Sequence, residues 1–268
     1  MPRYPVTKAG RRLGFARHFS CDHRGLLRVS DFIFFASQKY TSTSQCPPVV
    51  YTLTPPVRDQ GQLGDCVEFA STTLFTSTSL PGACPVYSPE ELYYVYRQSI
   101  GDIPDDCGSS ILGCLSVLQA QGVCLEQYNP YNPATFTQPP TNAALADAAT
   151  HKPKGVSKIV TLDDMILQIA NFQYGFVAGI AVFQSFEDAF NNGGAIPIPG
   201  QDEQLLGGHG IYVHDYDQDQ QLFVCQNSWG TEENGQVLGL PNNPGHFTLP
   251  FDYLLDPELC WEMGTIQV

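Results

Sequence analysis

Hydrophobic and polar positions follow two different periodicities along this chain, with helical spacing in the first half and strand-like spacing in the second. The segment GDCVEFASTTLF predicts a helix that begins at Cys66, because apolar residues follow there at intervals of three and four. A second helix is expected over 88–100, with Ser88 as its N-cap and a proline in its first turn. A third is expected over 108–122, where Gly122 marks the end.

A stretch rich in proline and asparagine, residues 128–140, separates the helical part from a region of predominantly strand-like pattern. One helix, at about 163–174, interrupts the strands. The longest apolar run, FVAGIAVF, is too short to cross a bilayer and is typical of a buried strand. This order indicates an α+β chain with a helical lobe over about 58–145 and a β-rich lobe over about 150–268. The expected strands are 156–161, 176–183, 194–198, 209–216, 221–227 and 246–250.

The composition of the 268-residue chain is that of a globular protein with a sizeable core, since 43% of its residues are hydrophobic. Its net charge of −14 is unevenly distributed: residues 1–40 carry eight Lys and Arg against two acids, and the rest carries five against twenty-five. Such an acidic body excludes nucleic acid as its substrate, because binding to phosphates requires a basic surface. We therefore expect a basic N-terminal extension, residues 1–45, before the main domain, residues 46–268. The extension is either a solvated tail or a segment that contacts an anionic partner or the acidic body of its own chain.

The cellular location stays open. The chain is expected to be soluble and without a transmembrane segment, and its N-terminus lacks the apolar core of a secretory signal, so a cytoplasmic or virion-associated protein is compatible with it. Its nine cysteines are an odd number, so at least one thiol is unpaired within the chain. His18, Cys21 and His23 carry metal-ligating side chains, but no second ligand pair accompanies them, and no metal or other cofactor is expected.

Cys66 is the first candidate for catalytic chemistry. Asp65 precedes the helix and Glu68 stands three positions later, which predicts a capping box with Asp65 as the N-cap. The thiol then lies at the first helical position, where unbonded backbone N–H groups and the positive end of the helix dipole favour a thiolate. A buried structural cysteine is the alternative, and spacing alone does not decide between the two.

A base for this thiol is expected in residues 207–230, where two apolar segments flank the turn-forming DQDQ and predict a β-hairpin. If the turn centres on Gln218, His209 and Asn227 lie directly opposite each other, with their Cβ atoms roughly 5 Å apart. The asparagine oxygen would then hold the imidazole in one orientation. A slip of one residue would separate the pair. His214 should point to the opposite face of the strand and is expected to be a packing or surface histidine.

Three stretches resemble the papain family of cysteine peptidases in that family's order of Cys, His and Asn: PVRDQGQLGDC (56–66), GGHG (207–210) and CQNSWG (225–230). Two more, GVCLEQYNPYNP and GHFTLPFDYL, resemble a lean microbial and viral branch of this cathepsin-like family. The resemblance extends over residues 47–268. It implies a two-lobe fold, with a helical left lobe, an antiparallel β-rich right lobe and an active-site cleft between them.

The resemblance also implies a role for each matching residue. Cys66 corresponds to the nucleophile, His209 to the general base and later acid, and Asn227 to the residue that orients the imidazole. Gln60 corresponds to the side-chain donor of the oxyanion hole, whose other donor is the backbone N–H of Cys66, and Trp229 to the indole that shields the His–Asn bond. Attack on an amide requires these parts: a thiolate, a proton for the leaving amine, and donors for the oxyanion.

The chain departs from the family pattern around the nucleophile. Leu63 replaces a cysteine that anchors a disulfide in papain, and Gly208 stands where many members have Asp or Asn before the histidine. Asp65 is therefore either a plain helix cap or, by hypothesis, a negative charge that partly replaces the missing one. Four cysteines are expected to be buried thiols or to form one or two disulfides: Cys84, Cys107, Cys114 and Cys124.

These residues together predict a cysteine endopeptidase that acts on protein or peptide substrates without a cofactor. A catalytically silent papain-fold binding or virion protein is one alternative, and an acyl transferase with the same triad is another. The N-terminal extension leads to a further hypothesis, autoinhibition, in which residues 31–38 (DFIFFASQ) bind the cleft while the basic residues before them pair with the acidic body. The alternative is an arm packed on the outside of the fold.

Overall fold

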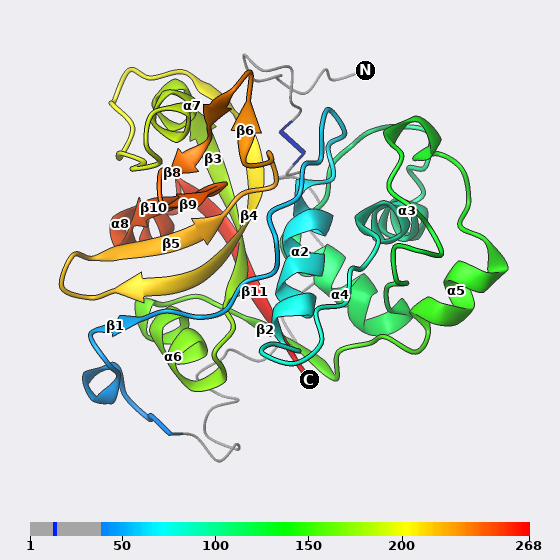
Figure 1. The fold of residues 1–268 in the computed structure, drawn as a ribbon, viewed down its shortest axis with the longest axis horizontal. Coiled ribbons are helices and arrows are strands. Elements are labelled where there is room, and N and C mark those ends of the chain that lie inside the picture. Colours follow the sequence, from blue (N-terminus) through cyan, green and yellow to red (C-terminus); the bar gives the residue numbers. More distant parts are fainter. Residues whose placement is uncertain (1–12, 15–38) are drawn as a thin grey trace.

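The computed structural model describes residues 13–14 and 39–268, and these form two lobes of different secondary structure (Figure 1). One lobe is helical and the other is built on an antiparallel sheet, with α2 where the two meet. The expected two-lobe α+β architecture is thereby confirmed. The helical lobe contains α2 (Cys66–Ser77), α3 (Pro89–Ile100), α4 (Ile111–Gln121), the 3-10 turn η2 (Pro133–Thr135) and α5 (Asn142–Ala148).

The main sheet has seven antiparallel strands, in the order β10-β5-β4-β3-β11-β2, with β1 paired to β4. Seven of the eight residues of β3 are buried, because α2 packs on one face of the sheet there and α6 and α7 pack on the other. The strands are β1 (Val49–Val50), β2 (Gly155–Lys158), β3 (Phe176–Phe183), β4 (Leu205–Asp217), β5 (Leu222–Gln226), β10 (His246–Pro250) and β11 (Cys260–Gln267).

Smaller elements surround this sheet. Two short hairpins follow β5, in which β6 pairs with β7 and β8 pairs with β9. Their bounds are β6 (Glu232–Glu233), β7 (Gln236–Val237), β8 (Gly239–Leu240) and β9 (Asn243–Pro244). The remaining helices are η1 (Thr43–Gln45), α6 (Leu162–Phe172), α7 (Gln184–Asn191) and α8 (Phe251–Leu255).

Local chemistry explains where several helices begin and end. The Ser88 side chain accepts a hydrogen bond from the third residue of α3, and a proline fills the first position of that helix, as expected. Ser110 caps α4 in the same way, and Gly122 ends it with a φ of 89° that other residues rarely adopt. Thr161 and Asp164 form a capping box at the start of α6.

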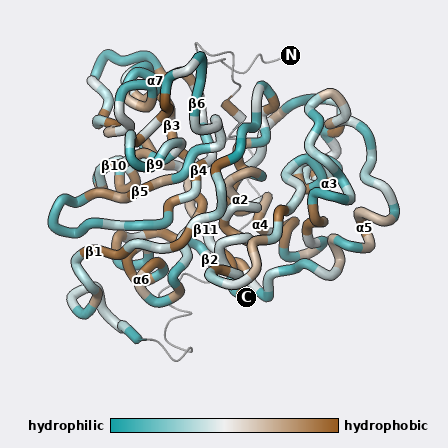
Figure 2. The backbone as a smooth tube through the Cα atoms, in the orientation of Figure 1, coloured by the Kyte–Doolittle hydropathy of each residue, from teal (hydrophilic) through white to brown (hydrophobic). Residues whose placement is uncertain are grey.

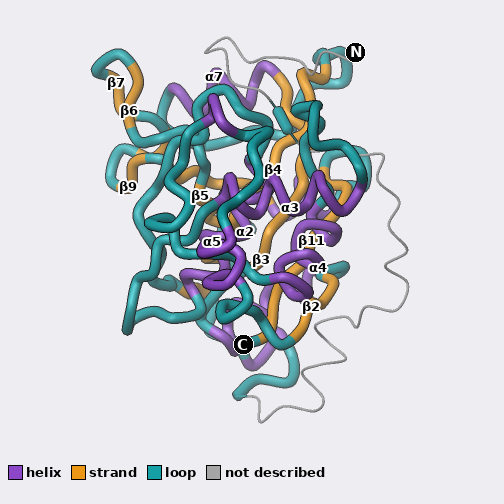
Figure 3. The backbone as a smooth tube through the Cα atoms, turned by 90° about the vertical axis from the view of Figure 1, so that its right-hand side faces the viewer, coloured by secondary structure: helices purple, strands orange, loops and turns teal. Residues whose placement is uncertain are grey.

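Two hydrophobic cores hold the lobes together. One core lies within the β-rich lobe, and the other joins α2, α3 and α4 to residues of β3, β4 and β11, such as Val177, Tyr212 and Ile266. Hydrophobic stretches therefore run along the strands and the inward helix faces, whereas the outer loops are hydrophilic (Figure 2). Viewed from the side of the helical lobe, the helices lie in front of the strands on which they pack (Figure 3).

The sequence pattern failed for several short elements and for one strand of eight residues. No strand forms over 194–198, where a single isolated bridge joins Ala195 to Thr248. Strand β11 and helices α5, α7 and α8 were not predicted. These helices span five to eight residues, too few for a helical periodicity to stand out, and their positions depend on packing against the sheet.

The eight cysteines in the described part of the chain are all free thiols, and seven of them are buried. Cys84, Cys107, Cys114 and Cys124 thus form no disulfide with one another; the last three are buried thiols, as one of the two expectations had it, whereas Cys84 is exposed. Over residues 39–268, no helix has both the length and the apolar character needed to cross a membrane.

Candidate active site

Cys66 is the first residue of α2 and has no exposed surface. Asp65 precedes it as the N-cap, but its side chain makes no capping hydrogen bond, because its backbone (φ −104°, ψ 28°) lacks the extended conformation of a usual N-cap. Glu68 does not reach back either: it accepts a hydrogen bond from the Ser109 hydroxyl on a neighbouring loop. The predicted capping box is therefore wrong, although the helix begins at the expected residue.

The thiol of Cys66 contacts strand β4, which also carries the candidate histidine. The backbone N–H of Gly210 donates to Cys66 Sγ at 3.2 Å. A Cβ on Gly210 would lie 2.9 Å from Val67 Cα, so glycine is required for the strand to lie this close to the first turn of α2. The residue before it, His209, has no exposed surface. The fold thus brings the sulfur against the strand that holds the imidazole.

His209 Nε2 lies 2.8 Å from Asn227 Oδ1, so the two side chains meet. The expected pairing of the two strands is nevertheless wrong. Tyr212 pairs with Gln226, which offsets the hairpin by two residues from the predicted register. The turn occupies 218–221, later than assumed, and Asn227 lies just beyond the end of β5, from where its side chain reaches back to the imidazole.

Aromatic side chains cover the His–Asn bond. The ring of Trp229 lies 4.7 Å from that of His209, and Trp229 is only 4% exposed. Phe186 and Phe190 of α7 make edge contacts with the indole at 5.9 and 5.5 Å. This cover keeps water from one side of the imidazole and so strengthens its hydrogen bond. The contribution of α7 was not predictable, because that helix was not expected.

Gln60 is held by hydrogen bonds on both of its sides. Its backbone N–H donates to Ser228 O at 2.9 Å, and the Ser228 hydroxyl donates to the side-chain Oε1 at 2.6 Å. The side-chain Nε2 donates to Leu63 O at 2.8 Å. These partners define the orientation of the amide, with its nitrogen toward the loop that leads to Cys66. Ser228 had no predicted role, although it lies inside the CQNSWG motif.

Burial controls the protonation of Cys66. It raises the pKa of the thiol from its ordinary value of 9.0 to about 12, and hydrogen bonds from the Gly210 and Gly14 amides only partly oppose this rise. Glu68 is also fully buried, and burial raises the pKa of its carboxyl to about 7. The thiol is therefore uncharged at neutral pH in this state of the protein.

Gly14, a residue of the N-terminal extension, lies beside the nucleophile. It accepts a hydrogen bond from the backbone N–H of Ser109 at 2.8 Å, and its own amide interacts with Cys66 Sγ. A Cβ on Gly14 would lie 1.8 Å from Gly64 O, and a Cβ on Gly108 would lie 1.7 Å from Gly14 O. Three glycine backbones therefore pack directly against one another, and no larger residue fits at Gly14.

Leu13, the residue before it, has no exposed surface and belongs to the core of the β-rich lobe that also includes Trp229. The Leu13–Gly14 segment therefore contacts both lobes and keeps water from the sulfur. Residues 31–38, which the autoinhibition hypothesis places in the cleft, lie outside the described residues. A segment of the extension does lie at the nucleophile, and it is one that the sequence pattern did not single out.

The other predicted residues lie away from the sulfur or outside the described chain. Gly208 pairs with Ala181 within the sheet. His214 is buried and packs against Tyr212 and His246, with ring centroids 5.7 and 5.2 Å apart. No group of three His, Cys, Asp or Glu in the described residues could hold a metal. The trio His18, Cys21 and His23 lies outside those residues.

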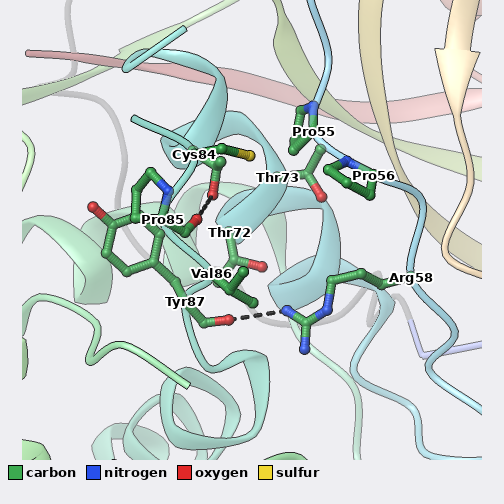
Figure 4. Close-up of a pocket in the computed structure, with 10 residues that line it drawn as sticks. Pro55, Pro56, Arg58, Thr72, Thr73, Cys84, Pro85, Val86 and Tyr87 are labelled. Atoms are coloured by element: carbon green, nitrogen blue, oxygen red, sulfur yellow. Dashed lines mark hydrogen bonds between the residues drawn. The ribbon is translucent and has the colours of Figure 1, made fainter. Parts of the chain in front are cut away.

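A separate pocket of about 170 Å³ lies along the middle of α2, away from its first turn (Figure 4). The Arg58 guanidinium donates to Tyr87 O at 2.9 Å at one side of it. None of the candidate catalytic side chains lines it. The lining residues are Pro55, Pro56, Arg58, Thr72, Thr73, Thr76, Cys84, Pro85, Val86 and Tyr87.

No protein-family model matches the chain. A relative from Acanthamoeba polyphaga mimivirus, named "uncharacterized peptidase C1-like protein L477", is 28% identical over 221 residues, which cover 78% of this chain and 68% of the relative. Xylellain, a cysteine protease from Xylella fastidiosa, is structurally similar with a TM-score of 0.80 at 24% identity. The similarity covers 100% of this chain and 99% of the xylellain chain. The Carica candamarcensis protease CMS1MS2, solved with E-64, has a TM-score of 0.54 at 21% identity, over 79% of this chain and 92% of its own.

These comparisons confirm both the fold and the resemblance. The chain has the papain-like two-lobe fold, which it shares with a bacterial and a plant cysteine protease. The viral relative agrees with the expected microbial and viral branch.

Proposed function

We propose that the chain is a papain-like cysteine endopeptidase in which Cys66 is the nucleophile and His209 the general base and acid. Asn227 orients the imidazole, and Gln60 donates to the oxyanion. The observation that carries the proposal is one set of contacts: Sγ 3.2 Å from the amide that follows His209, and the imidazole 2.8 Å from the Asn227 oxygen. The names of the relatives, which are cysteine proteases or a peptidase-like protein, support the same class.

The order of proton transfers follows from which nitrogen of His209 is already hydrogen-bonded to Asn227. Nε2–H donates to Asn227, so Nδ1 is the nitrogen that takes the thiol proton. The thiolate of Cys66 then attacks the substrate carbonyl carbon, and the Cys66 N–H and Gln60 Nε2 stabilise the oxyanion. The imidazolium returns its proton to the leaving amine, which leaves an acyl-enzyme. Water, deprotonated by the same imidazole, releases the acid and regenerates the thiol.

We also propose that the N-terminal extension inhibits the enzyme through the Leu13–Gly14 segment. With this segment in place Cys66 has no exposed surface, and a substrate carbonyl has no path to the sulfur. The raised pKa of the thiol adds to the inhibition, because only the thiolate is a strong nucleophile. Departure of the segment would expose the sulfur to water and to substrate at the same time.

The test uses full-length chains carrying Gly14→Val, a change that cannot be accommodated beside Gly64. We expect such a chain to cleave a quenched peptide library and to be labelled at Cys66 by E-64, the compound present in the CMS1MS2 structure. Cys66→Ala in the same background should abolish both. Gln60→Ala should lower kcat by roughly 10²–10³ while E-64 labelling persists, because one oxyanion donor typically has that effect.

The burial of Cys66 is the observation that favours the rival, a catalytically silent papain fold. A folded Gly14→Val chain that neither cleaves peptides nor reacts with E-64 would establish that rival and refute the peptidase. The third reading, acyl transfer, is tested in the same digest by adding a primary amine. Products that carry the amine, with no hydrolysis when the amine is omitted, would identify a transferase, because the acyl-enzyme of a peptidase also reacts with water alone.

A further inference from the structure

Tyr131 contacts both Gln60 and Asp65, and neither Tyr131 nor Asp65 takes part in the chemistry described above. Tyr131 Oη is 2.7 Å from the backbone oxygen of Gln60 and 3.2 Å from Asp65 Oδ1. A tyrosine hydroxyl has one hydrogen, and a backbone carbonyl can only accept. The hydrogen of Tyr131 therefore goes to Gln60, at the shorter distance.

This assignment determines the state of the carboxyl group. Once the tyrosine hydrogen points to Gln60, a lone pair of Oη faces Asp65 Oδ1. Two oxygens at 3.2 Å attract each other only if a proton lies between them. The carboxyl of Asp65 must supply that proton, because the tyrosine has none left. The contacts form a complete chain only with a protonated Asp65.

The surroundings of Asp65 favour the same state. Its side chain is fully buried, and among the described residues nothing hydrogen-bonds to Oδ2. The charged groups that act on it include two acids, Glu68 and Asp106, and one base, Arg58, which forms an ion pair with Glu126. Burial, and next the charge of Glu68, hold the pKa of the Asp65 carboxyl well above its ordinary range.

We propose that Asp65 is a neutral carboxylic acid in the working enzyme and that Asp65 and Tyr131 are positioning residues for the oxyanion donor. The acid donates to the tyrosine, and the tyrosine donates to the carbonyl of Gln60. The backbone of Gln60 is then held on one side by this chain and on the other by Ser228. The proposal rests on the peptidase function proposed above.

A neutral acid has a further effect on the nucleophile. Asp65 is the neighbour of Cys66 in the chain, and a carboxylate there would oppose formation of the thiolate. A protonated Asp65 carboxyl removes this one opposing charge, while burial and the charge of Glu68 still act on the thiol. This reverses the earlier hypothesis that Asp65 supplies a negative charge to the Cys–His pair.

The kinetic test compares variants in the Gly14→Val background. Tyr131→Phe and Asp65→Ala each remove a link, and we expect kcat to fall roughly threefold to tenfold with KM little changed, because the oxyanion exists only in the transition state. Asp65→Asn should recover most of the loss, since its amide Nδ2 can still donate to the tyrosine. Adding Tyr131→Phe to Asp65→Asn should cost no more than Tyr131→Phe alone.

Tyr253→Phe is the matched control. Its hydroxyl, like that of Tyr131, donates to a backbone carbonyl, here Ala181 O at 2.9 Å, but this bond is more deeply buried and lies in the β-rich lobe away from Gln60. We expect it to lower the free energy of unfolding about as much as Tyr131→Phe does, with kcat unchanged. An equal loss of kcat in both tyrosine variants, or an Asp65→Asn variant as slow as Asp65→Ala, would overturn the positioning role.

A second readout does not depend on turnover. A protonated carboxyl has an infrared C=O band distinct from that of a carboxylate, and the difference spectrum between the starting chain and Asp65→Asn at neutral pH should contain one. Absence of this band refutes the neutral acid whether or not the protein cleaves peptides. If the band is present in a chain that cleaves no peptide, the neutral acid stands and the peptidase function fails.

Discussion

Gly14→Val is the most direct test of the proposed inhibition by the Leu13–Gly14 segment. The added Cβ would begin 1.8 Å from the carbonyl oxygen of Gly64, which belongs to the backbone and has no rotamer to change. The remaining carbons of valine only enlarge the clash. The Leu13–Gly14 segment must therefore leave its position, and Cys66 becomes accessible while its lobe keeps its structure.

The size of the effect follows from the protonation of the sulfur. Burial raises the pKa of the Cys66 thiol from 9.0 to about 12, so the covered thiol holds about 10³-fold less thiolate at neutral pH than an ordinary exposed thiol. Access of water should restore much of this factor, even though the hydrogen bond from the Gly14 amide is lost, and removal of the covering backbone gives the reagent access to the sulfur. We expect the rate of alkylation of Cys66 by iodoacetamide to rise on the order of 10³-fold in the variant.

The assay has an internal standard in the same chain. Cys84 is the exposed member of the eight described cysteines, and its alkylation should not depend on Gly14. Mass spectrometry of the peptides that contain Cys66 and Cys84 gives the ratio of the two rates at each time point. The control substitution is Gly200→Val, since a Cβ at Gly200 meets no atom within 4 Å. That control should leave the ratio as it is in the unmodified chain.

An unchanged ratio in Gly14→Val would refute the reasoning, provided that circular dichroism shows the same folded structure in both variants. It would mean that Cys66 is protected by something other than the Leu13–Gly14 segment. A rise of only a few-fold would show that the sulfur remains buried after the segment has left, and would contradict the assignment of its pKa to that contact.

Three further predictions concern the walls of the site and the sheet behind it. Ser228→Ala leaves Oε1 of Gln60 without its donor, so kcat of the activated enzyme should fall about tenfold with KM nearly constant in steady-state assays; equal values would contradict this. Gly210→Ala forces a Cβ to within 2.9 Å of Val67 Cα, so urea unfolding should show a loss of about 1–3 kcal/mol; an unaltered midpoint would be the contrary result. Burial, and next the neighbouring imidazole, lower the pKa of His246 from 6.5 to about 4. Between these two pH values the unfolded chain binds a proton that the folded chain does not, so the free energy of unfolding falls as the pH drops. His246→Gln should remove a contribution on the order of 3 kcal/mol from the difference in unfolding free energy between pH 7 and pH 4, and a variant as acid-sensitive as the original chain would be evidence against it.

The sequence was sufficient wherever local chemistry sets the structure. The start of α3 at Ser88 and the end of α4 at Gly122 depend on a side-chain cap and on a positive φ, and both were predicted. The capping box at Asp65 failed because a tertiary partner, the Ser109 hydroxyl, bonds to Glu68 in place of the helix N-terminus. A local motif therefore predicts a local bond only where no distant group competes for it.

Contacts between residues far apart in the chain could not be predicted from the sequence. The register of the hairpin depends on a bulge at His214 and on a turn later than Gln218, and neither leaves a clear trace in the pattern. Tyr131 and Ser228 reach Gln60 from 71 and 168 residues away in the chain. Gly14 could not be singled out among the glycines, because its importance comes from two other glycine backbones beside it.

The close approach of β4 to α2 at Gly210 has a mechanical consequence. The backbone of Gly210 lies directly against the Cys66 sulfur and against the backbone and side chain of Val67, so the lobes have no compliant layer at this point that could act as a hinge. A motion that separates the two lobes would pull the Cys66 sulfur away from strand β4 and break the alignment that the proposed catalysis needs. Under the proposed inhibition, control comes from the segment that covers the thiol, and activation requires that segment to leave while the two lobes keep their positions.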